Sequence, residues 1–585
     1  MTDKHVPWIQ RIVFFTALAA TTIVATGAGR SGASNDPATT TPIKHVIVIF
    51  QENVSFDHYF GSYPVAANST AGEPVFKAAE DTPAVNGLLT GPAAPPNNPT
   101  LAAFGTGTVQ PFRLGRNQAT TCDEDHNYTD EQAAYHAGQM DLVVRKLSST
   151  ATNCAADKST VMGYYDGNTV TALWNYAQHF AMNDNSFGTT YGPSTPGALN
   201  LISGNTHGVS GGNVTGFGPV SGINQTTGAS GTATVNIAGS DSNGNTGGGS
   251  IVGDPRPFGD ICNPLGSTQV KISDPSKTIG DLLNDKGITW GWFQGGFGNC
   301  NSIHMGSDGN PKQDYIGHHE PFNYFSSTQN LNHLPPSSPA KIGLTDQANH
   351  QYDLNALFKV TSASGASSRI YDITGFQTGV TLPAVTFLKA PGFMDGHAQY
   401  SDPLLEQHFI TQIVNTVMES KYWKDTAIII LYDDSDGWYD HVYPPLVNAS
   451  ALGALAASSD ALTGVGQCGV PLPDAILGRC GYGPRMPFIV ISPFARSNYV
   501  DHTVTDQSSV LRFIEDNFKL GRIDQTSPKA VAAGGSFDQI AGSIDSMFDF
   551  DHDRDGRGDG DHDRDDEGHH SLLILDPDTG QPAHH

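Results

Sequence analysis

Positive charge is scarce in this sequence. Lysine and arginine number 31 against 58 aspartates and glutamates, which gives a net charge of -27, and only 15% of all residues are charged. Non-specific nucleic-acid binding needs a basic surface, so this composition argues against a nucleic-acid-binding protein. It does not exclude an anionic substrate, because a bound cation can reverse the local field.

Long apolar runs are missing beyond the N-terminus. There, Lys4 and Arg11 precede the apolar run 12–25, and small residues follow this run through Gly29. A basic start, a short apolar middle and a small-residue end predict a secretory signal peptide at 1–29. The alternative is an uncleaved membrane anchor, although the run is short for a span. We expect no membrane span after signal removal, and a periplasmic or secreted protein.

Cysteine is sparse and has no metal-binding spacing. The six cysteines form no CxxC pair, which favours disulfide bonds in an oxidising compartment over metal ligation. Sequence order suggests the pairs Cys122–Cys154, Cys262–Cys300 and Cys468–Cys480. Six cysteines allow many other pairings, which the sequence leaves open.

The chain is long and rich in loop-forming residues. At 585 residues it could form two domains, or one large α/β domain with long insertions. Its 65 glycines and 36 prolines predict many loops, while 38% hydrophobic residues suffice for a packed core. The stretches 66–107 and 205–259 lack the periodicity of an independent core, so we expect them to be surface insertions.

Apolar runs typical of strands buried on both faces recur along the chain. They are residues 45–50, 288–293, 384–388, 427–432 and 486–491. Helical patterns occupy residues 278–285, 403–421 and 508–518, and Asp402 and Pro403 provide a clear start for the second. Alternating strands and helices predict an α/β fold, with a largely parallel sheet between helices and long loop insertions.

An acidic stretch at 549–570 follows the predicted core. It holds ten acids against three arginines between Asp549 and Glu567, which predicts a solvated, disordered segment. Residues 551–556 resemble the first half of a calcium-binding EF-hand loop, but His562 stands where a glutamate should close that site. An apolar run then opens a C-terminal segment, 571–585.

Polar residues directly follow two of the predicted strands. They are Glu52 and Asn53 after the first strand, and Asp433, Asp434 and Asp436 after the fourth. A parallel sheet brings strand ends to one edge, where carboxylate and amide oxygens can hold a hard cation. Each motif alone could instead be a capping turn or a solvated acidic loop. Their matching positions favour a divalent metal site.

Ser194 lies in the motif GPSTPG, ahead of a helix-like segment. The N–H groups and dipole of a helix N-terminus favour an anion such as phosphate. Beside a cation, the hydroxyl could ionise and attack phosphorus, giving a phosphoseryl intermediate. The alternative is a serine that only caps the helix. No G-x-S-x-G elbow surrounds Ser194, which disfavours an ordinary Ser-His-Asp hydrolase.

Several histidines lie in polar loops between the predicted core elements. They are His126, His318, His319 and His397. Loop histidines of this kind are candidates for metal ligands, general acids or phosphate donors. Each one, taken singly, could equally be an ordinary surface histidine.

Four separated segments carry a recognisable pattern. They are HVIVIFQENVSFDHYFGSYP (45–64), GPSTPGALNLISG (192–204), DDSDGWYDHVYPP (433–445) and GPRMPFIVISPFAR (483–496). Together they resemble the bacterial phosphoesterase family, which contains phospholipases C and the respiratory-burst-inhibiting acid phosphatases. The serine of GPSTPG, the aspartate pair of DDSDG and the closing LLILDPDTGQP (572–582) look more like the acid phosphatase branch.

The resemblance implies an alkaline-phosphatase-like α/β sandwich, with a catalytic domain at 43–548. It implies a metal ion held by Glu52, Asn53, Asp433 and Asp434, the nucleophile Ser194, and phosphate-binding or proton-transferring His126, His319 and His397. The family often has arginine after its Glu-Asn pair, whereas Val54 stands here. Any contact made by that arginine is therefore missing.

Together these features predict an exported, metal-dependent acid phosphatase that acts on small phosphomonoesters through a phosphoserine intermediate. The nearest alternative is a phospholipase C that cleaves phosphodiesters such as phosphatidylcholine, although no amphipathic basic helix indicates membrane binding. An alternative of another class, suggested by the acidic stretch, is a non-catalytic exported cation-binding protein. The sequence indicates neither the identity of the metal nor the oligomeric state.

Overall fold

The computed structural model describes residues 37–89, 102–104, 107–149, 159–210, 237–238, 249–272, 276–448, 450, 476–524, 535–550 and 572–583. The predicted signal peptide, most of the insertion 205–259 and nearly all of the acidic stretch lie outside the described residues. Cys154 and Cys468, two of the predicted disulfide partners, also lie outside them.

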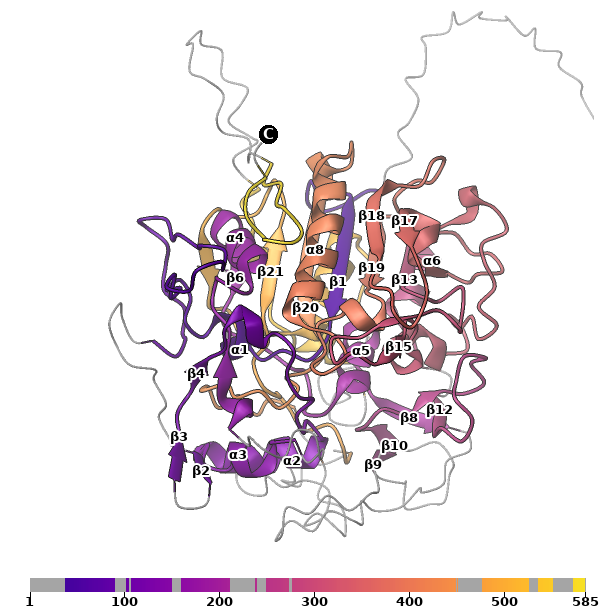
Figure 1. The fold of residues 1–585 in the computed structure, drawn as a ribbon. Coiled ribbons are helices and arrows are strands. Elements are labelled where there is room, and N and C mark those ends of the chain that lie inside the picture. The colour runs from indigo at the N-terminus through magenta and orange to yellow at the C-terminus, as the bar shows by residue number, and fades with distance from the viewer. Residues whose placement is uncertain are drawn as a thin grey trace, which may run out of the picture. The chain divides into compact units, whose positions relative to one another are not determined.

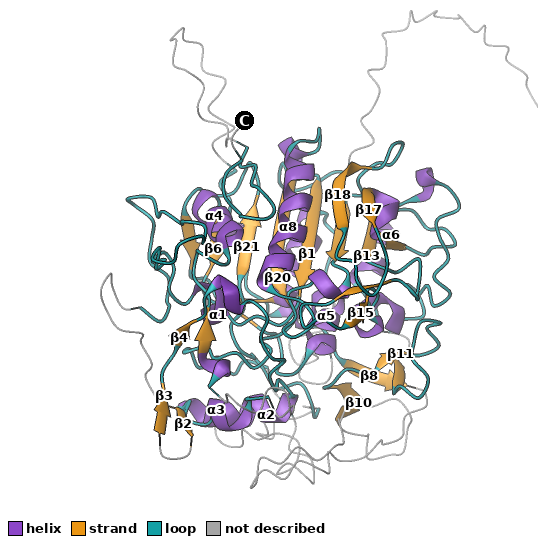
Figure 2. Cartoon of the chain, in the orientation of Figure 1, coloured by secondary structure: helices purple, strands orange, loops and turns teal. Residues whose placement is uncertain are grey.

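An eight-stranded sheet forms the centre of the described chain (Figures 1 and 2), with strand order β16-β13-β19-β1-β20-β21-β6-β22. Its members are β1 (His45–Gln51), β6 (Ala181–Asn183), β13 (Trp290–Gln294), β16 (Gln351–Asp353), β19 (Val385–Lys389), β20 (Thr426–Tyr432), β21 (Phe488–Ile491) and β22 (Tyr499–Asp501). Within this sheet, β21 runs antiparallel to β20 and β6, and all other neighbours are parallel. The predicted α/β class with a largely parallel sheet is therefore confirmed.

All five predicted strands lie in this sheet. Every residue of β20 is buried, as expected for a strand whose alternating side chains are covered on both faces. The strand predicted at 288–293 begins two residues later, at Trp290. Strands β6, β16 and β22 were not predicted, because three residues each are too few to show a periodic pattern.

Helices pack around the sheet, and α8 lies in front of β1 and β20 in Figure 1. They are α1 (Phe56–Phe60), α2 (Tyr128–Tyr135), α3 (Val143–Lys146), α4 (Thr171–His179), α5 (Ser194–Ser203), α6 (Ile279–Lys286), α7 (Leu354–Leu357), α8 (Pro403–Met418) and α10 (Gln507–Asn517). Helices α6, α8 and α10 confirm the three predicted helical segments. The Asp402 side chain caps α8 by accepting the N–H groups of Leu404 and Leu405, both at 2.9 Å.

Smaller β elements surround the main sheet. A five-stranded sheet contains β11 (Arg256–Pro257), β12 (Gln269–Ile272), β8 (His207–Ser210), β10 (Gly249–Ile251) and β9 (Ile237–Ala238). Two-stranded pairs are formed by β2 (Ala102–Phe104) with β3 (Gly107–Val109), β4 (Phe112–Arg113) with β5 (Gly163–Tyr164), β7 (Ser186–Phe187) with β23 (Thr505–Asp506), β14 (Ile303–Met305) with β15 (Pro311–Gln313), and β17 (Phe358–Ser362) with β18 (Tyr371–Phe376).

Disulfide bonds are present in the described chain. Cys262 and Cys300 are bonded as predicted, with their Cα atoms 5.1 Å apart. Cys122 and Cys480 are also disulfide-bonded, and their predicted partners lie outside the described residues.

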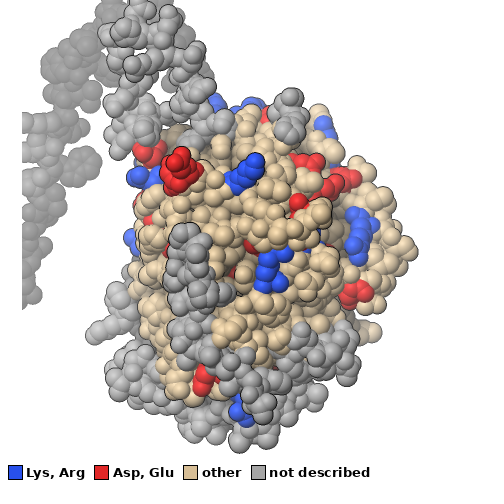
Figure 3. Space-filling model, turned by 60° about the vertical axis from the view of Figure 1, so that its left-hand side comes forward, with Lys and Arg blue, Asp and Glu red and all other residues tan. Residues whose placement is uncertain are grey.

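Charge is sparse on the face drawn in Figure 3, where isolated basic and acidic side chains lie among uncharged residues. Among the described residues, no helix combines the length and apolar character needed to cross a membrane.

Candidate metal and phosphate site

The register of two neighbouring strands brings the two acidic motifs together. Strand β1 pairs in parallel with β20 up to Gln51 and Tyr432, so the residues that follow each strand emerge at the same edge. The backbone N–H of Asn53 donates to Oδ1 of Asp433 at 3.0 Å. Adjacent parallel strands thus place Glu52 and Asn53 beside Asp433 and Asp434.

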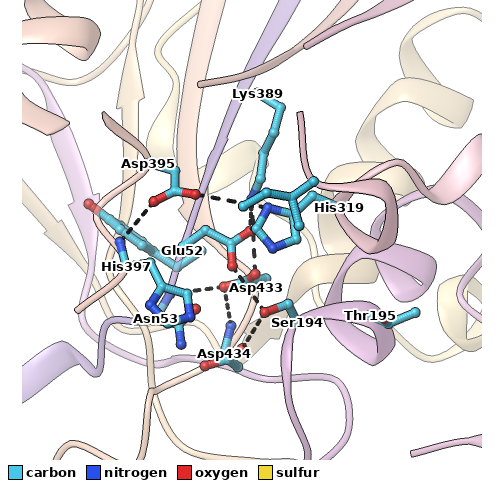
Figure 4. Close-up of polar contacts among 12 residues, drawn as sticks. Glu52, Asn53, Ser194, Thr195, His319, Lys389, Asp395, His397, Asp433 and Asp434 are labelled. Atoms are coloured by element: carbon cyan, nitrogen blue, oxygen red, sulfur yellow. Dashed lines mark hydrogen bonds and ion pairs between the residues drawn. The ribbon is translucent and has the colours of Figure 1, made fainter. Parts of the chain in front are cut away.

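Ser194 is the first residue of α5, and its hydroxyl points toward the carboxylates of Glu52 and Asp434 (Figure 4). Its Oγ lies 3.0 Å from Oε2 of Glu52 and 3.2 Å from Oδ2 of Asp434. The residue is only 3% exposed, which keeps this hydroxyl away from bulk water. The serine is therefore held between the ends of both strands.

Close approach of α5 to β20 depends on the last glycine of the GPSTPG motif. A Cβ atom on Gly197 would lie 2.1 Å from the backbone oxygen of Asp433, which no side chain could tolerate. The absence of a side chain therefore lets the helix pack directly on the strand end. This contact fixes the distance between Ser194 and the acidic edge.

The N-terminus of α5 has fewer N–H groups to offer a phosphate than the sequence suggested. The Thr195 N–H donates to Oδ1 of Asp254 at 3.0 Å, and Pro196 has no N–H. Asp254 already occupies part of the anion-binding end of this helix. The helix terminus therefore positions Ser194, but its backbone N–H groups do not form a complete phosphate-binding site.

The four candidate histidines gather around the same edge. Nδ1 of His319 lies 3.1 Å from Oε1 of Glu52. The ring of His318 packs edge-on against the ring of His319, with the two ring centroids 4.4 Å apart. Nε2 of His126 lies 3.4 Å from Nδ2 of Asn53. The rings of His126 and His397 are 6.4 Å apart. These histidines therefore lie close to the strand ends that carry Glu52, Asn53, Asp433 and Asp434.

Further polar side chains of this site escaped the sequence interpretation. Lys389, the last residue of β19, contacts Oε1 of Glu52 and lies 4.0 Å from Oδ2 of Asp433. Asp395 accepts the backbone N–H of His397 at 3.1 Å. The available signal was the lysine that directly follows the apolar run 384–388, because Glu52 likewise lies close to the end of an apolar strand.

Burial dominates the electrostatics of the carboxylates. It raises the pKa of Glu52 well above its ordinary value, and the neighbouring carboxylate of Asp433 raises it further. The pKa of Asp434 is raised by the same two causes. Burial also raises the pKa of Asp395 to about 7. Such a concentration of buried acids favours either protonation or a bound cation.

The histidines divide into two kinds. Burial lowers the pKa of His319 well below its ordinary value, with further lowering by His318 and Lys389, so this ring is neutral. Burial also lowers the pKa of His397, to about 4. At His126, burial opposes the charge, but Asp434 and Asp436 outweigh it and raise the pKa well above its ordinary value. His126 is thus the protonated ring of the site.

Unsatisfied polar atoms at this edge fit a divalent cation. Among the buried atoms of the described chain that have no hydrogen-bond partner are Oδ1 of Asn53, Nε2 of His319 and the Oδ2 atoms of Asp395, Asp433 and Asp436. Buried polar atoms without partners are costly, and oxygens with an imidazole nitrogen form a common donor set for divalent metals. The residues present therefore fit the metal that the sequence predicts.

Two sets of metal-ligating groups converge on this region. In the first, ligand-capable atoms of Glu52, His319 and Asp395 lie within 4.8 Å of one another. In the second, the same spacing joins Asp123, His397 and Asp436. Both sets lie beside the strand ends that carry Asp433 and Asp434.

Comparison with known proteins agrees with this geometry. The sequence model of the Phosphoesterase family matches residues 43–521, which is most of the chain. The non-hemolytic phospholipase C of Burkholderia pseudomallei is 25% identical over 88% of this chain and 60% of its own length. Phospholipases C B and C A of Mycobacterium tuberculosis are 24% and 23% identical, over 83% and 89% of this chain and 75% and 79% of their lengths.

The alignments cover a larger share of this chain than of the relatives. Most of this chain aligns, but the alignment spans less than two thirds of the Burkholderia relative. The family match includes both strand ends and Ser194. This chain belongs to the phosphoesterase family.

Proposed function

We propose that this chain is a metal-dependent phosphate-ester hydrolase in which Ser194 is the nucleophile. The observation that carries the proposal is the position of its Oγ, 3.0 Å from Glu52 and 3.2 Å from Asp434 at the N-terminus of α5. A hydroxyl buried between two carboxylates has proton acceptors within hydrogen-bond distance. Membership of the phosphoesterase family supports the same chemistry.

Glu52, Asn53, Asp433 and Asp434 would hold the divalent ion, and unpartnered Oδ1 of Asn53 and Oδ2 of Asp433 support this set. Bound there, the ion supplies positive charge that lowers the pKa of the serine hydroxyl and offsets charge on the phosphoryl oxygens.

Attack by Oγ of Ser194 forms a phosphorus–oxygen bond while the bond to the leaving alkoxide breaks. The serine proton passes to Glu52 or Asp434, both within hydrogen-bond distance. His126 donates a proton to the leaving oxygen, because the carboxylate of Asp436 favours its imidazolium form. His397, with its pKa lowered to about 4, would instead contact the phosphate as a neutral ring.

Water then hydrolyses the phosphoserine. His126, neutral after the first step, accepts the proton of the attacking water, and the bond between phosphorus and Oγ breaks. The serine recovers its proton from the carboxylate that took it. After the second step, His126 is protonated again and the carboxylate is again ionised, as they were at the start.

Phosphomonoesters are the proposed substrates. The serine of GPSTPG, the aspartate pair at 433–434 and the segment 572–582 resemble the acid phosphatase branch of the family. A second candidate is supported by the relatives, which are named phospholipases C. Such an enzyme would use the same residues on a phosphodiester substrate.

Fold and export form part of the same proposal. The largely parallel sheet with helices around it supports the alkaline-phosphatase-like sandwich, over a catalytic domain at 43–548. The Cys262–Cys300 disulfide supports an oxidising compartment reached through the signal peptide at 1–29. The acidic stretch 549–570 and the C-terminal segment 571–585 would be additions to this domain.

Substitution of the nucleophile, combined with two substrates, tests the proposal. Ser194→Ala should lower kcat on p-nitrophenyl phosphate by at least about 10³-fold, because a nucleophile acts as a unit with its partners. Ser203→Ala, at the other end of α5, is the matched control and should keep nearly full activity. Activity of Ser194→Ala within tenfold of the wild type would remove Ser194 from this role.

The same preparation distinguishes the two substrate classes. A monoesterase should turn over p-nitrophenyl phosphate much faster than p-nitrophenylphosphorylcholine. The reverse preference would favour the phospholipase C candidate and contradict the monoester assignment.

A further inference from the structure

A second cluster of polar side chains lies on the small β elements and shares no residue with the candidate metal and phosphate site. It consists of His304 on β14, Asp314 directly after β15, and Ser362, the last residue of β17 (β15 and β17 are labelled in Figure 1). Strands β14 and β15 are an antiparallel pair, so the hairpin brings Asp314 back toward His304. One hairpin thus supplies two members of the cluster, and a later strand supplies the third.

His304 joins the other two side chains through its two ring nitrogens. Nδ1 lies 2.6 Å from Oδ1 of Asp314, and Nε2 lies 3.0 Å from Oγ of Ser362. An ionised carboxylate can only accept a hydrogen bond, so the ring proton belongs on Nδ1 and Nε2 is left to accept the serine hydroxyl. Serine, imidazole and carboxylate are thus linked in the order that activates a serine nucleophile.

The imidazole and the carboxylate are held in place by buried contacts. His304 is 0% exposed and Asp314 is 1% exposed. Oδ2 of Asp314 accepts the hydroxyl of Ser302 at 2.6 Å, so both carboxylate oxygens have partners. The ring of His304 stacks on the ring of Phe393, with the two centroids 4.5 Å apart. A base and its orienting acid are therefore fixed before any reactant arrives.

Two backbone hydrogen bonds fasten the segment after β17 to β14, on either side of His304. The N–H of Gly365 donates to the oxygen of Ile303 at 2.7 Å, and the N–H of Met305 donates to the oxygen of Ser368 at 2.7 Å. The end of β17 is therefore held in register with the histidine, which fixes the serine next to its base.

Ser362 differs from its two partners because it is exposed. A reactant in solution can approach its hydroxyl, while the base behind it is shielded from water. A network that served only to join β17 to β14 would gain more from a buried serine, since water competes for the hydrogen bond of an exposed hydroxyl. Exposure of this one member favours a reactive site.

We propose that Ser362, His304 and Asp314 form a second nucleophilic site, which reacts with carboxylic esters. Small acyl groups joined to a good leaving group fit the site, because the exposed hydroxyl is reached directly from solution. The inference does not depend on the proposed phosphate-ester chemistry, which uses other residues.

The reaction is an acyl transfer followed by hydrolysis. Oγ of Ser362 attacks the carbonyl carbon, and its proton passes to Nε2 of His304. The bond between that carbon and the alcohol oxygen breaks, the departing oxygen takes the proton from Nε2, and an acyl-serine remains. Water then attacks the acyl carbon and gives a proton to Nε2. The bond from the acyl carbon to Oγ breaks, and the serine recovers the proton, so the products are an acid and an alcohol.

Covalent labelling of the full chain tests this inference. The protein is treated with p-nitrophenyl acetate, and separately with a fluorophosphonate probe, which bonds its phosphorus to a reactive serine oxygen and releases fluoride. Peptide mapping by mass spectrometry distinguishes an adduct on Ser362 from one on Ser194. Both reagents should modify Ser362. Ser362 that is modified no faster than Ser367, an exposed serine in the turn after β17, would overturn the inference.

Removal of the base separates a reactive triad from a structural network. His304→Gln keeps a polar side chain that can form hydrogen bonds but cannot act as a base. The rate of Ser362 labelling should fall by at least about 100-fold, the usual contribution of a general base, while the thermal midpoint reports any loss of folding. Labelling of Ser362 at the wild-type rate in His304→Gln would overturn the inference.

Exposed substitutions decide the question if the buried histidine cannot be replaced. Ser362→Ala should lose the hydrolysis of p-nitrophenyl acetate that the wild type shows above the spontaneous rate. Ser367→Ala is the matched control and should keep it. Equal hydrolysis by both variants would show that Ser362 is not a nucleophile and would overturn the inference.

Discussion

Single residues in this site are held in positions that folding alone would not favour. Asn53 has a φ of 60°, in the left-handed region that few non-glycine residues adopt. Its side chain donates to Oδ1 of Asp436 at 2.9 Å, while its own oxygen has no partner among the described residues. Strained backbone and unpaired polar atoms at one place are typical of ligand sites.

At the residue scale, Asp433 should be the most sensitive of the proposed metal ligands. Its Oδ1 already accepts the N–H groups of Asn53 and Asp434, which leaves Oδ2 for the ion. Asp433→Asn removes the charge, so we expect Mn²⁺ affinity to fall by at least about 100-fold, judged from the effects of altered metal-site residues. Calorimetric titration measures the change.

A surface aspartate provides the control for that experiment. Asp285, on α6, has a side chain that is 68% exposed and lies outside the site. Asp285→Asn should leave Mn²⁺ affinity unchanged. An equally unchanged affinity in Asp433→Asn would exclude Asp433 as a ligand.

At the scale of elements, the site depends on how closely one helix approaches one strand. Helix α5 carries Ser194, and β20 leads into Asp433 and Asp434. The contact of Gly197 with the backbone of Asp433 sets their separation. The geometry of the site therefore depends on Gly197, a residue that has no side chain.

Gly197→Ala should uncouple the helix from the strand. The new Cβ must move away from the Asp433 oxygen, and a displacement of about 1 Å in a catalytic group can lower the rate by about 100-fold. Alanine favours a helix over glycine by about 1 kcal/mol, so any loss of thermal stability would report the clash. The measurements are kcat on p-nitrophenyl phosphate and the thermal midpoint.

Gly365 is the matched glycine, since a Cβ there would meet nothing within 4 Å. Gly365→Ala should preserve both activity and stability. If Gly197→Ala matched it in both, close packing of α5 on β20 would not be needed for activity.

At the scale of the whole molecule, buried ionisable groups make folding stability depend on pH. His58 lies in α1, its ring stacked on Trp438 at 3.9 Å, and Nδ1 is 2.8 Å from the Gly163 carbonyl oxygen. Burial lowers the pKa of His58 from 6.5 to about 3. The folded protein therefore keeps this ring neutral well into the acid range.

The sign of the effect follows from that lowered pKa. Below pH 6.5 the unfolded chain protonates His58 before the folded chain does, so stability is lost as the pH falls from 6.5 toward 3. The lost contribution is about 5 kcal/mol, at 1.36 kcal/mol for each pH unit. His58→Phe keeps the ring stacking and should remove this part of the dependence.

Denaturant unfolding of both proteins across this pH range measures the difference. As the pH falls, the free energy of unfolding of the wild type should decrease relative to that of His58→Phe. The other ionisable groups titrate equally in both proteins, so this difference reports His58. Parallel curves for wild type and His58→Phe would contradict the assignment.

Much of the candidate site could be predicted because its residues directly follow strands. The apolar runs before Glu52 and Asp433 marked buried strands, and parallel strands end at one edge. Lys389 and Asp395 were missed for a physical reason. A lysine after an apolar run looks solvent-exposed until β19 is known to lie beside β1, where Glu52 receives its charge.

Local chemistry in the sequence by itself determined five of the eight strands of the main sheet, the helices α6, α8 and α10, the α/β class and the residue types of the site. Those properties depend on short-range patterns of apolar, charged and turn-forming residues. Only the tertiary structure decided that β1 lies between β19 and β20, that α5 touches the strand end, and that Lys389 neutralises Glu52. These contacts join segments more than a hundred residues apart, where packing and charge pairing between distant segments, rather than local preference, set the geometry.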